Sequence, residues 1–195
     1  MKNLMKMIMV SIIGIMLSTT SSMATESKEF KVLPIFTEDN WDPEIEVELV
    51  NGVMDFNKDG VDKSKAIGLG FSFACPVFTL PGNHILRQQL NVNMYDKEGM
   101  SIANLEMNPH YFFKIEDNFL LGFGPGVGVM KVNPDNSEEQ LLLTAQAGVS
   151  MKYYIGNVMA GFDIRHQWTA EKNLGNGIDE NMDNTRYLVK VGYSF

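Results

Sequence analysis

The sequence predicts an all-β protein built as an eight-stranded antiparallel up-and-down transmembrane β-barrel. Three observations predict this fold class. The chain begins with an export signal, eight later segments alternate between apolar and polar or small residues, and short connections between these segments alternate with longer ones. Alternation with a period of two is the pattern of a β-strand whose two faces have different surroundings.

The N-terminal residues 1–24 have the pattern of a secretory signal peptide. A basic start at Lys2 and Lys6 precedes the apolar run MIMVSIIGIML, and small residues at Ser22 and Ala24 mark a cleavage site. The apolar run is too short for a membrane-spanning helix. We therefore expect the chain to be exported.

The rest of the chain divides into two parts. Residues 25–43 are predicted to be a periplasmic segment, and their irregular stretch LPIFTEDNWDP is expected to plug or brace the base of a barrel formed by residues 44–195. No stretch after the signal approaches the roughly 18 apolar residues of a transmembrane helix. Any membrane-spanning part must therefore be a closed barrel, which leaves no backbone group unpaired in lipid.

Composition excludes several functions. The whole chain has a net charge of −8, and removal of the signal leaves 14 basic and 24 acidic residues, a net charge of −10. Nucleic acid is therefore not expected as a partner. Cys75 is the only cysteine, so no internal disulfide is possible, and three scattered histidines do not predict a zinc site.

The first four segments each have one apolar face. In residues 44–54, Ile, Val and Leu alternate with glutamates, and in 66–75 large apolar residues alternate with Gly, Ser and Ala. In 85–95 the intervening residues are Arg, Gln and Asn, and in 101–113 they are Asn, Glu and His. Each segment is long enough to cross a membrane as a tilted strand, which takes about 9–11 residues.

The last four segments continue this alternation. Residues 119–130, FLLGFGPGVGVM, set Leu, Phe, Pro and Val against glycines, and 143–155 set apolar residues and Tyr against Thr, Gln, Gly, Ser and Lys. Residues 158–168 oppose apolar side chains to Gly, Asp, Arg and Gln, and 186–195 end the chain on an alternating strand. The spacing predicts eight strands in all.

Connection lengths indicate which end of the barrel faces outward. The short connections are PVFTLPG, KIEDN and GN, whereas DFNKDGVDKSK, KVNPDNSEEQ and TAEKNLGNGIDENMDN are longer and polar. Only DKEG is a short connection on the long-loop side. Short turns at one end and longer loops at the other are typical of outer-membrane barrels.

The glycines distinguish a membrane barrel from a soluble β-sandwich. Segment 119–130 carries four glycines on one face, and 66–75 carries two. On the exposed face of a sandwich such glycines would only weaken the strand. Inside a narrow barrel they relieve crowding among side chains. The pattern therefore favours the barrel over the alternative of a soluble periplasmic β-protein.

With its signal peptide, eight alternating strands, LLGFGPGVGVM and the ending YLVKVGYSF, the chain resembles the small outer-membrane barrels of the opacity-protein, OmpA-barrel and OmpW type. The resemblance covers residues 44–195. It implies a place in the outer membrane of a Gram-negative bacterium, among outer-membrane lipid and lipopolysaccharide. It also implies that Phe195, with Tyr193 and Val191, is the signal read by the barrel-assembly machinery.

Charged residues of both signs occur on the polar faces of the strands. We interpret them as a salt-bridge and hydrogen-bond network that plugs the lumen, because buried charges need partners. The alternative is a narrow, porin-like polar path. The predicted network consists of Glu46, Glu48, Arg87, Glu106, Lys152, Asp163, Arg165, Arg186 and Lys190.

One connection resembles the first half of a calcium loop. In DFNKDG, Asp55, Asn57 and Asp59 have the spacing of oxygen ligands before a glycine, but Ala66 stands at the twelfth position where a bidentate Glu is expected. The simpler interpretation is a solvated turn, with weak calcium binding as the alternative. No other cofactor is predicted.

No catalytic motif stands out. The glycines of GFGPGVG do not fit a nucleotide-binding loop. Some eight-stranded barrels are lipid A deacylases with His and Ser two residues apart, but two residues after His166 is Trp168. His110 is predicted to point inward, next to Glu106, in a structural role. We therefore predict no enzymatic activity.

The expected function is structural or surface-exposed, as in adhesion, interaction with a partner or a surface antigen. The first alternative is an OmpW-like conduit for a small hydrophobic ligand, with an apolar pocket at the outer half of the lumen formed by residues such as Met54, Leu142 and Met159. The second alternative, a barrel enzyme that modifies lipid A, is disfavoured because no Ser lies two residues after His166.

Overall fold

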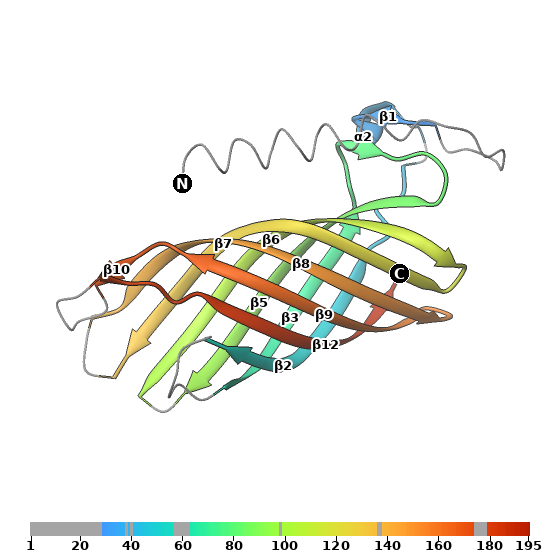
Figure 1. Ribbon diagram of the computed structural model, residues 1–195. Coiled ribbons are helices and arrows are strands. Elements are labelled where there is room, and N and C mark those ends of the chain that lie inside the picture. The colour runs from blue at the N-terminus through green and yellow to red at the C-terminus, as the bar shows by residue number, and fades with distance from the viewer. Residues whose placement is uncertain are drawn as a thin grey trace.

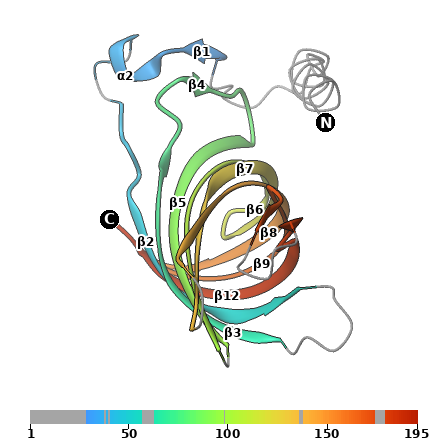
Figure 2. The same ribbon diagram turned by 90° about the vertical axis from the view of Figure 1, so that its left-hand side faces the viewer.

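Eight long strands close into one barrel in the computed structural model, which describes residues 29–37, 39, 41–56, 63–97, 99–135, 138–173 and 179–195. Every neighbouring pair is antiparallel, and the order around the barrel is β12-β2-β3-β5-β6-β7-β8-β9 (Figures 1 and 2). The predicted fold class is confirmed. The strands are β2 (Glu46–Asp55), β3 (Ser64–Ala74), β5 (His84–Lys97), β6 (Met100–Glu116), β7 (Phe119–Pro134), β8 (Gln140–Ile155), β9 (Val158–Thr169) and β12 (Asn184–Ser194).

The first and last long strands close the barrel against each other. Tyr193 of β12 pairs with Val47 of β2, and the backbone N–H of Phe195 donates a hydrogen bond of 2.9 Å to the carbonyl of Ile45. The closing ladder therefore extends to the last residue of the chain. A closed ladder leaves no sheet edge exposed to lipid.

The strands separate their side chains into two environments. Outward-facing residues such as Leu49, Leu69 and Val127 form an apolar surface around the barrel, and Leu69 is 57% exposed. Inward-facing residues, including Glu46, Arg165 and Arg186, are buried. Apolar side chains outside and charged side chains inside are the reverse of a soluble protein, and they fit a wall surrounded by lipid.

We call the end of the barrel with the short turns the periplasmic end, as the connection lengths predict, and the opposite end the outer end. A charged side chain marks the outer limit of the apolar belt on β7, and aromatic rings lie at its periplasmic limit. On β7 the outward-facing apolar row ends at Lys131, whose ammonium group lies 2.7 Å from Glu139. At the opposite end the rings of Tyr111, Phe113 and Phe123 pack with centroids 4.9 to 5.9 Å apart. An aromatic cluster of this kind is expected at the membrane–water interface.

Glycine in β7 allows the barrel wall to be narrow. A Cβ atom at Gly126 would lie 1.8 Å from Asn108 Oδ1, and one at Gly124 would lie 2.2 Å from the carbonyl oxygen of Pro109. Both contacts are far closer than any real Cβ makes. These glycines therefore let β6 and β7 approach while the lumen stays filled with side chains.

Smaller elements lie at the two ends of the barrel. At the outer end β10 (Lys172–Asn173) pairs with β11 (Asp179–Glu180). At the periplasmic end β1 (Lys31–Val32) pairs with β4 (Phe78–Thr79), and the four-residue helix α2 (Pro34–Thr37) follows β1. We call β1, α2 and β4 the periplasmic flap.

The flap lies beside the ring of strands (Figures 1 and 2). The described part of the predicted N-terminal segment therefore does not plug the lumen. It braces the rim, because the backbone N–H of Ala74 donates to the carbonyl of Pro43 over 2.7 Å and Arg87 contacts Glu44. The predicted signal peptide lies outside the described residues. No helix among the described residues is long and apolar enough to cross a membrane.

Candidate functional site: the lumen

The periplasmic half of the lumen holds a chain of buried charges. Lys152 of β8 donates hydrogen bonds to Glu46 and to Glu48 of β2, the latter over 2.6 Å. Lys190 of β12 lies 3.1 Å from Glu48 Oε2 and 2.7 Å from Asp163 Oδ2. Since antiparallel strands point alternate residues inward, these side chains from four strands converge on the barrel axis.

A second charged group lies farther toward the outer end. Arg186 of β12 donates to Glu106 of β6, to Gln146 of β8 and, over 3.2 Å, to the hydroxyl of Tyr95. Gln167 Nε2 also lies 3.5 Å from Glu106 Oε1. The partners come from strands on different sides of the barrel, so the guanidinium spans the lumen.

The structure brings together the predicted network and balances its charge at the rim. All nine predicted residues are buried. They comprise four acids and five bases, and the base without a partner among them, Arg87, contacts Glu44 Oε2 at 3.1 Å and Ser72 Oγ at 2.8 Å. Glu44 therefore completes the balance. Buried charges in this number are tolerated only when each finds an opposite charge or a hydrogen-bond partner.

Sequence reasoning missed some neutral members of the network. Tyr154 donates a hydrogen bond of 2.7 Å to Glu46 Oε2, and Tyr95 and Gln146 contact Arg186. Their positions in the two-residue alternation place them inward. Tyrosine near a strand end is ambiguous in sequence, because membrane-interface tyrosines occur in the same places.

His110 lies in the lumen between a serine and an arginine. Its predicted neighbour was Glu106, but its hydrogen-bond partners are Arg165 Nη2 at Nδ1 and Ser150 Oγ at Nε2, both at 2.9 Å. The guanidinium can only donate, so Nδ1 accepts and Nε2 carries the proton that is donated to Ser150. A histidine in this tautomer cannot remove a proton from the serine. The group therefore fills the lumen.

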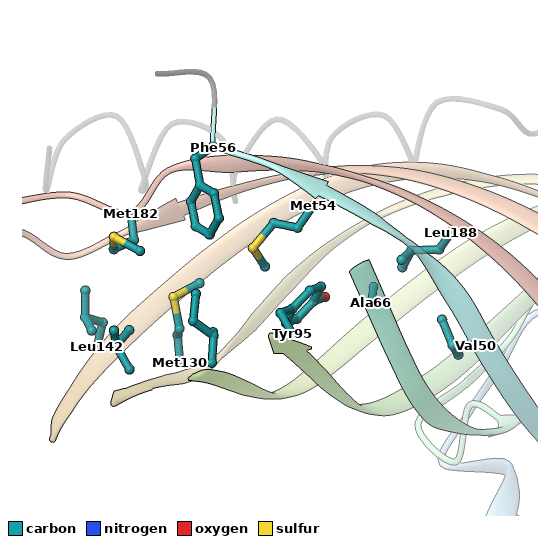
Figure 3. Close-up of a cluster of buried hydrophobic side chains, with 11 residues drawn as sticks. Val50, Met54, Phe56, Ala66, Tyr95, Met130, Leu142, Met182 and Leu188 are labelled. Atoms are coloured by element: carbon teal, nitrogen blue, oxygen red, sulfur yellow. The ribbon is translucent and has the colours of Figure 1, made fainter. Parts of the chain in front are cut away.

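An apolar layer occupies the lumen near the outer end. Met54, Met130 and Leu142 are at most 1% exposed, and they pack with Phe56 and Met182 from the connections outside the strands (Figure 3). The full cluster is Val50, Met54, Phe56, Ala66, Tyr95, Ile102, Met130, Val132, Leu142, Met182 and Leu188. Side chains therefore fill the position of the predicted apolar pocket.

Met159 lies at the other end of the lumen from this apolar layer. It is buried and faces the lumen. However, it is the second residue of β9 and pairs with Gly192 and Tyr154 near the periplasmic end. Its sulfur lies over Gly161, 3.1 Å from the position of an added Cβ. The hypothesis that Met159 joins Met54 and Leu142 at the outer half is therefore wrong, because β9 starts at the opposite end of the barrel.

The C-terminal residues of the predicted assembly signal face outward. Phe195, Tyr193 and Val191 are all exposed, Phe195 at 75%, and the rings of Phe195 and Tyr193 lie 5.1 Å apart. They form one apolar row on the lipid side of the closing strand. Recognition by an assembly machinery stays a prediction.

The calcium hypothesis falls largely on residues that the structure does not describe. Asp55 is described, and one carboxylate oxygen lies 3.2 Å from Lys63 Nζ. Asn57 and Asp59 lie outside the described residues. Within the described part of the chain, no three His, Cys, Asp or Glu side chains are grouped so that they would hold a metal ion.

His166 lies on the outer face near the end of β9. Its Nδ1 is 3.0 Å from Thr185 Oγ1, and its ring packs edge-on against Trp168 with centroids 4.8 Å apart. It therefore contacts a threonine hydroxyl on the neighbouring strand and an indole. Neither contact supplies the acid or base partner that would activate a nucleophile.

Solved structures of small outer-membrane barrels share this fold. Neisserial surface protein A aligns with a TM-score of 0.55 at 10% identity, over 77% of this chain and 96% of that one. The N-terminal barrel domain of Pseudomonas aeruginosa OprF aligns with a TM-score of 0.50 at 17% identity, over 77% and 96%. The fold is that of the small eight-stranded outer-membrane barrels. The predicted resemblance to this class is confirmed.

The same fold also carries catalysis in other proteins. The outer-membrane enzyme PagL aligns with a TM-score of 0.51 at 15% identity, over 77% of this chain and 99% of that one. No protein-family model and no curated protein sequence matches the chain. At such low identity the comparisons establish the barrel fold and support an outer-membrane location, and activity has to be argued from the lumen and the surface.

Proposed function

We propose that this protein is a non-enzymatic outer-membrane barrel with a structural or surface-exposed role. Its long outer connections would meet the cell's surroundings, and its wall would hold them in place. The observation that carries the proposal is that two separate layers of side chains fill the lumen. A charged layer around Lys152 and an apolar layer around Met54 lie one behind the other along the axis.

The two layers oppose passage for different physical reasons. An ion crossing the apolar layer would lose its hydration without gaining a polar partner. An apolar molecule crossing the charged layer would have to separate Lys152 and Lys190 from their carboxylates, and separating a buried pair costs about 3–5 kcal/mol. Neither class of solute therefore has a favourable path along the whole axis.

Reconstitution in planar bilayers tests the closed lumen. We expect no steady single-channel current from the folded protein. A current should appear in a variant in which both layers are opened. This variant carries Lys152→Ala and Lys190→Ala in the charged layer and Met54→Ala and Leu142→Ala in the apolar layer. Variants that open only one layer serve as matched controls and should remain closed. A steady current from the unmodified protein would contradict the proposal and favour a polar path.

Lipid analysis tests the absence of enzymatic activity. The folded protein is incubated with lipid A and with phospholipid, and the products are examined by mass spectrometry. We expect both lipids to remain intact. Loss of an acyl chain that persists in repeat preparations, and disappears when the protein is unfolded, would refute a purely non-enzymatic role.

A surface role is tested on cells. Cells that carry the protein are compared with cells that carry a variant whose β9–β12 connection is shortened, with equal amounts of folded barrel. Weaker attachment or antibody binding by the variant, with unchanged membrane integrity, is expected for a surface role. Loss of integrity alone would favour a structural role of the barrel wall.

The apolar layer favours a second candidate, binding of a small hydrophobic molecule at the outer end. Met54, Met130 and Met182 give this layer unbranched, adaptable side chains that can rearrange around a ligand. An apolar fluorescent probe should then bind the folded protein, and Met130→Glu should abolish binding. Binding unaffected by Met130→Glu would place the probe on the lipid-facing surface and exclude this candidate.

A further inference from the structure

The periplasmic flap has an apolar face that nothing in the described structure covers. Phe30, next to β1, stacks on Phe78 of β4 with ring centroids 6.1 Å apart and an interplanar angle of 18°. The helix α2 adds Ile35 and Phe36, and Phe36 is 81% exposed. The exposed apolar residues of the flap and directly beside its elements are Phe30, Val32, Leu33, Ile35, Phe36, Val77 and Phe78.

The other face of the flap is polar and turns toward the barrel. Lys31 pairs with Thr79 across the two short strands, whereas Val32 pairs with Phe78. Glu29, Lys31 and Thr79 line a pocket of about 290 Å³ between the flap and the barrel rim, with Trp41 and Glu44 on the rim side. Phe78 also lines this pocket and is 39% exposed, so its ring borders both faces of the flap. In water the preferred arrangement would be the reverse, with the apolar face packed inward.

The pocket places the flap over the rim of the barrel and the adjoining part of its outer wall. Its lining includes Cys75 and Leu86, which continue the outward-facing rows of β3 and β5. Cys75 is only 3% exposed although it follows Phe71 and Phe73 on the lipid side. Figures 1 and 2 both show the flap displaced sideways from the ring of strands, near its periplasmic end.

The flap therefore lies where the membrane surface meets the barrel. His84 lines the pocket on the wall side, stacks on Tyr111 and packs edge-on against Phe113, and these two rings belong to the periplasmic aromatic cluster. Through His84 the flap therefore borders the aromatic edge of the lipid-facing belt. An amphipathic element at this height places its apolar face about 5–10 Å into the boundary between head groups and acyl chains.

The backbone of the flap suits such an environment. The N–H of Leu33 donates to the carbonyl of Val77 over 2.7 Å, and the carbonyl of Leu33 accepts from the N–H of Phe36 at 2.9 Å and from Thr37 Oγ1 at 3.2 Å. Leu33 adopts a left-handed conformation with φ of 54°, which turns the chain from β1 into α2. Satisfied backbone groups lower the cost of contact with lipid.

We propose that the periplasmic flap is a lateral anchor that inserts its apolar face into the periplasmic leaflet of the outer membrane. The occupant of this face is phospholipid. Insertion depends on apolar area, because the acids Glu29, Asp39 and Asp42 outnumber Lys31 in the described part of this region, so that it does not attract anionic head groups. Contact with lipid is therefore expected to persist at high salt and in vesicles without anionic lipid.

Tryptophan fluorescence in brominated lipid tests the anchor. The variant Phe36→Trp is made in a Trp41→Phe, Trp168→Phe background, so that the introduced indole is the only one in the chain. The protein is folded into phosphatidylcholine vesicles, and a boiled-versus-unboiled gel shift verifies the barrel. We expect blue-shifted emission and strong quenching, greatest when bromine is near the top of the acyl chains.

Two control variants set the range of the signal. The Trp41→Phe variant, in which Trp168 on the lipid-facing wall is the only indole, should be quenched by the brominated lipids. Asp117→Trp, made in the background without Trp41 and Trp168, lies in the fully exposed β6–β7 turn and should show weaker quenching. Adding Val32→Asp and Ile35→Asp to Phe36→Trp should reduce quenching to the level of the turn control. Quenching that survives these two charges would contradict the assignment of the apolar face.

Two other results would overturn the proposal. Emission at the wavelength of a hydrated indole, quenched by iodide and not by brominated lipid, would mean that the flap projects into water. Blue-shifted emission that depends on the protein-to-lipid ratio, together with cross-links between chains, would mean that a second copy of the chain covers the face.

Discussion

At the scale of single residues, Lys152 is the side chain on which the charged layer depends. It is fully buried and contacts two carboxylates, Glu46 and Glu48, which come from the same face of β2. Without the ammonium group, two like charges would remain next to each other in a medium of low dielectric constant. The interior of this barrel is thus stabilised by matched charges, where a soluble protein would use apolar packing.

Replacement of this lysine is therefore expected to be costly. Lys152→Met should lower the free energy of unfolding by about 3–5 kcal/mol, because it leaves the buried Glu46 without a cation and Glu48 with Lys190 alone. The control is Lys131→Met on the outer surface, where both partners are about half exposed and the expected loss is about 0–1 kcal/mol. Urea titration of both variants, followed by the gel shift of the folded form, measures the difference, and equal losses would contradict the network.

The C-terminal phenylalanine is the residue on which assembly is predicted to depend. Phe195→Asp should reduce the amount of folded barrel in the outer membrane, measured by fractionation and immunoblot. Ile155→Asp is a suitable control, since Ile155 and Phe195 are similarly exposed at 73% and 75% and both lie at the periplasmic end. Normal amounts of the Phe195→Asp variant would separate this residue from assembly.

At the scale of elements, the alternation of each strand assigns its two faces. In β3, Leu69 lies in the apolar belt, and Lys65 lies four residues toward the outer end on the same face. The strand therefore passes from head groups to hydrocarbon within a few residues. A charge placed at the two positions should have very different effects.

We expect Leu69→Arg to destabilise the folded barrel by about 2–4 kcal/mol, since it places a charge near the middle of the bilayer. The matched control Lys65→Arg keeps the charge at the edge of the belt and should change stability little. Unfolding titrations in lipid vesicles compare the two variants. Equal stability of Leu69→Arg and the unmodified protein would mean that this face of β3 does not contact lipid.

Two prolines interrupt the ladder between β6 and β7. Met107 pairs with Val127 and Tyr111 with Phe123, and between these pairs Pro109 lies opposite Pro125. Proline has no backbone N–H to donate and is rare inside sheets. The wall therefore has a seam in which the cross-strand hydrogen bonds of one residue pair are missing.

Restoring the two donors is expected to strengthen this seam. The double variant Pro109→Val, Pro125→Val should stabilise the barrel by about 1–3 kcal/mol, at about 0.5–1.5 kcal/mol for each hydrogen bond gained. Hydrogen exchange at His110 and Gly126, next to the seam, should slow, while exchange near Gly148 on β8 serves as the control. Unchanged exchange would show that water does not reach the seam.

At the scale of the whole molecule, closure of the ladder should make the fold resistant to detergent. Eight strands paired all around leave no free edge from which unfolding can begin. We therefore expect the unboiled protein from the outer-membrane fraction to migrate differently from the boiled protein on SDS gels. A chain released by carbonate without detergent, and showing no shift, would contradict the membrane location.

Much of the barrel wall could be predicted from the sequence, because alternation of side chains is a local property. The segments 119–130 and 143–155 lie within β7 and β8 as the structure has them, and their faces point as predicted. Contacts across the lumen could not be predicted. His110 contacts Ser150 and Arg165, which are 40 and 55 residues away, because tilt and register bring their strands opposite each other.

The sequence by itself determined that this chain forms eight strands with an apolar and a polar face, and hence a membrane barrel, because burial of one face in lipid requires alternation along the strand. The tertiary structure alone decided which charges pair, that Met159 lies away from Met54, and that the flap turns its apolar face outward. Those features depend on the closure and shear of the barrel, which set the height of every side chain along the axis.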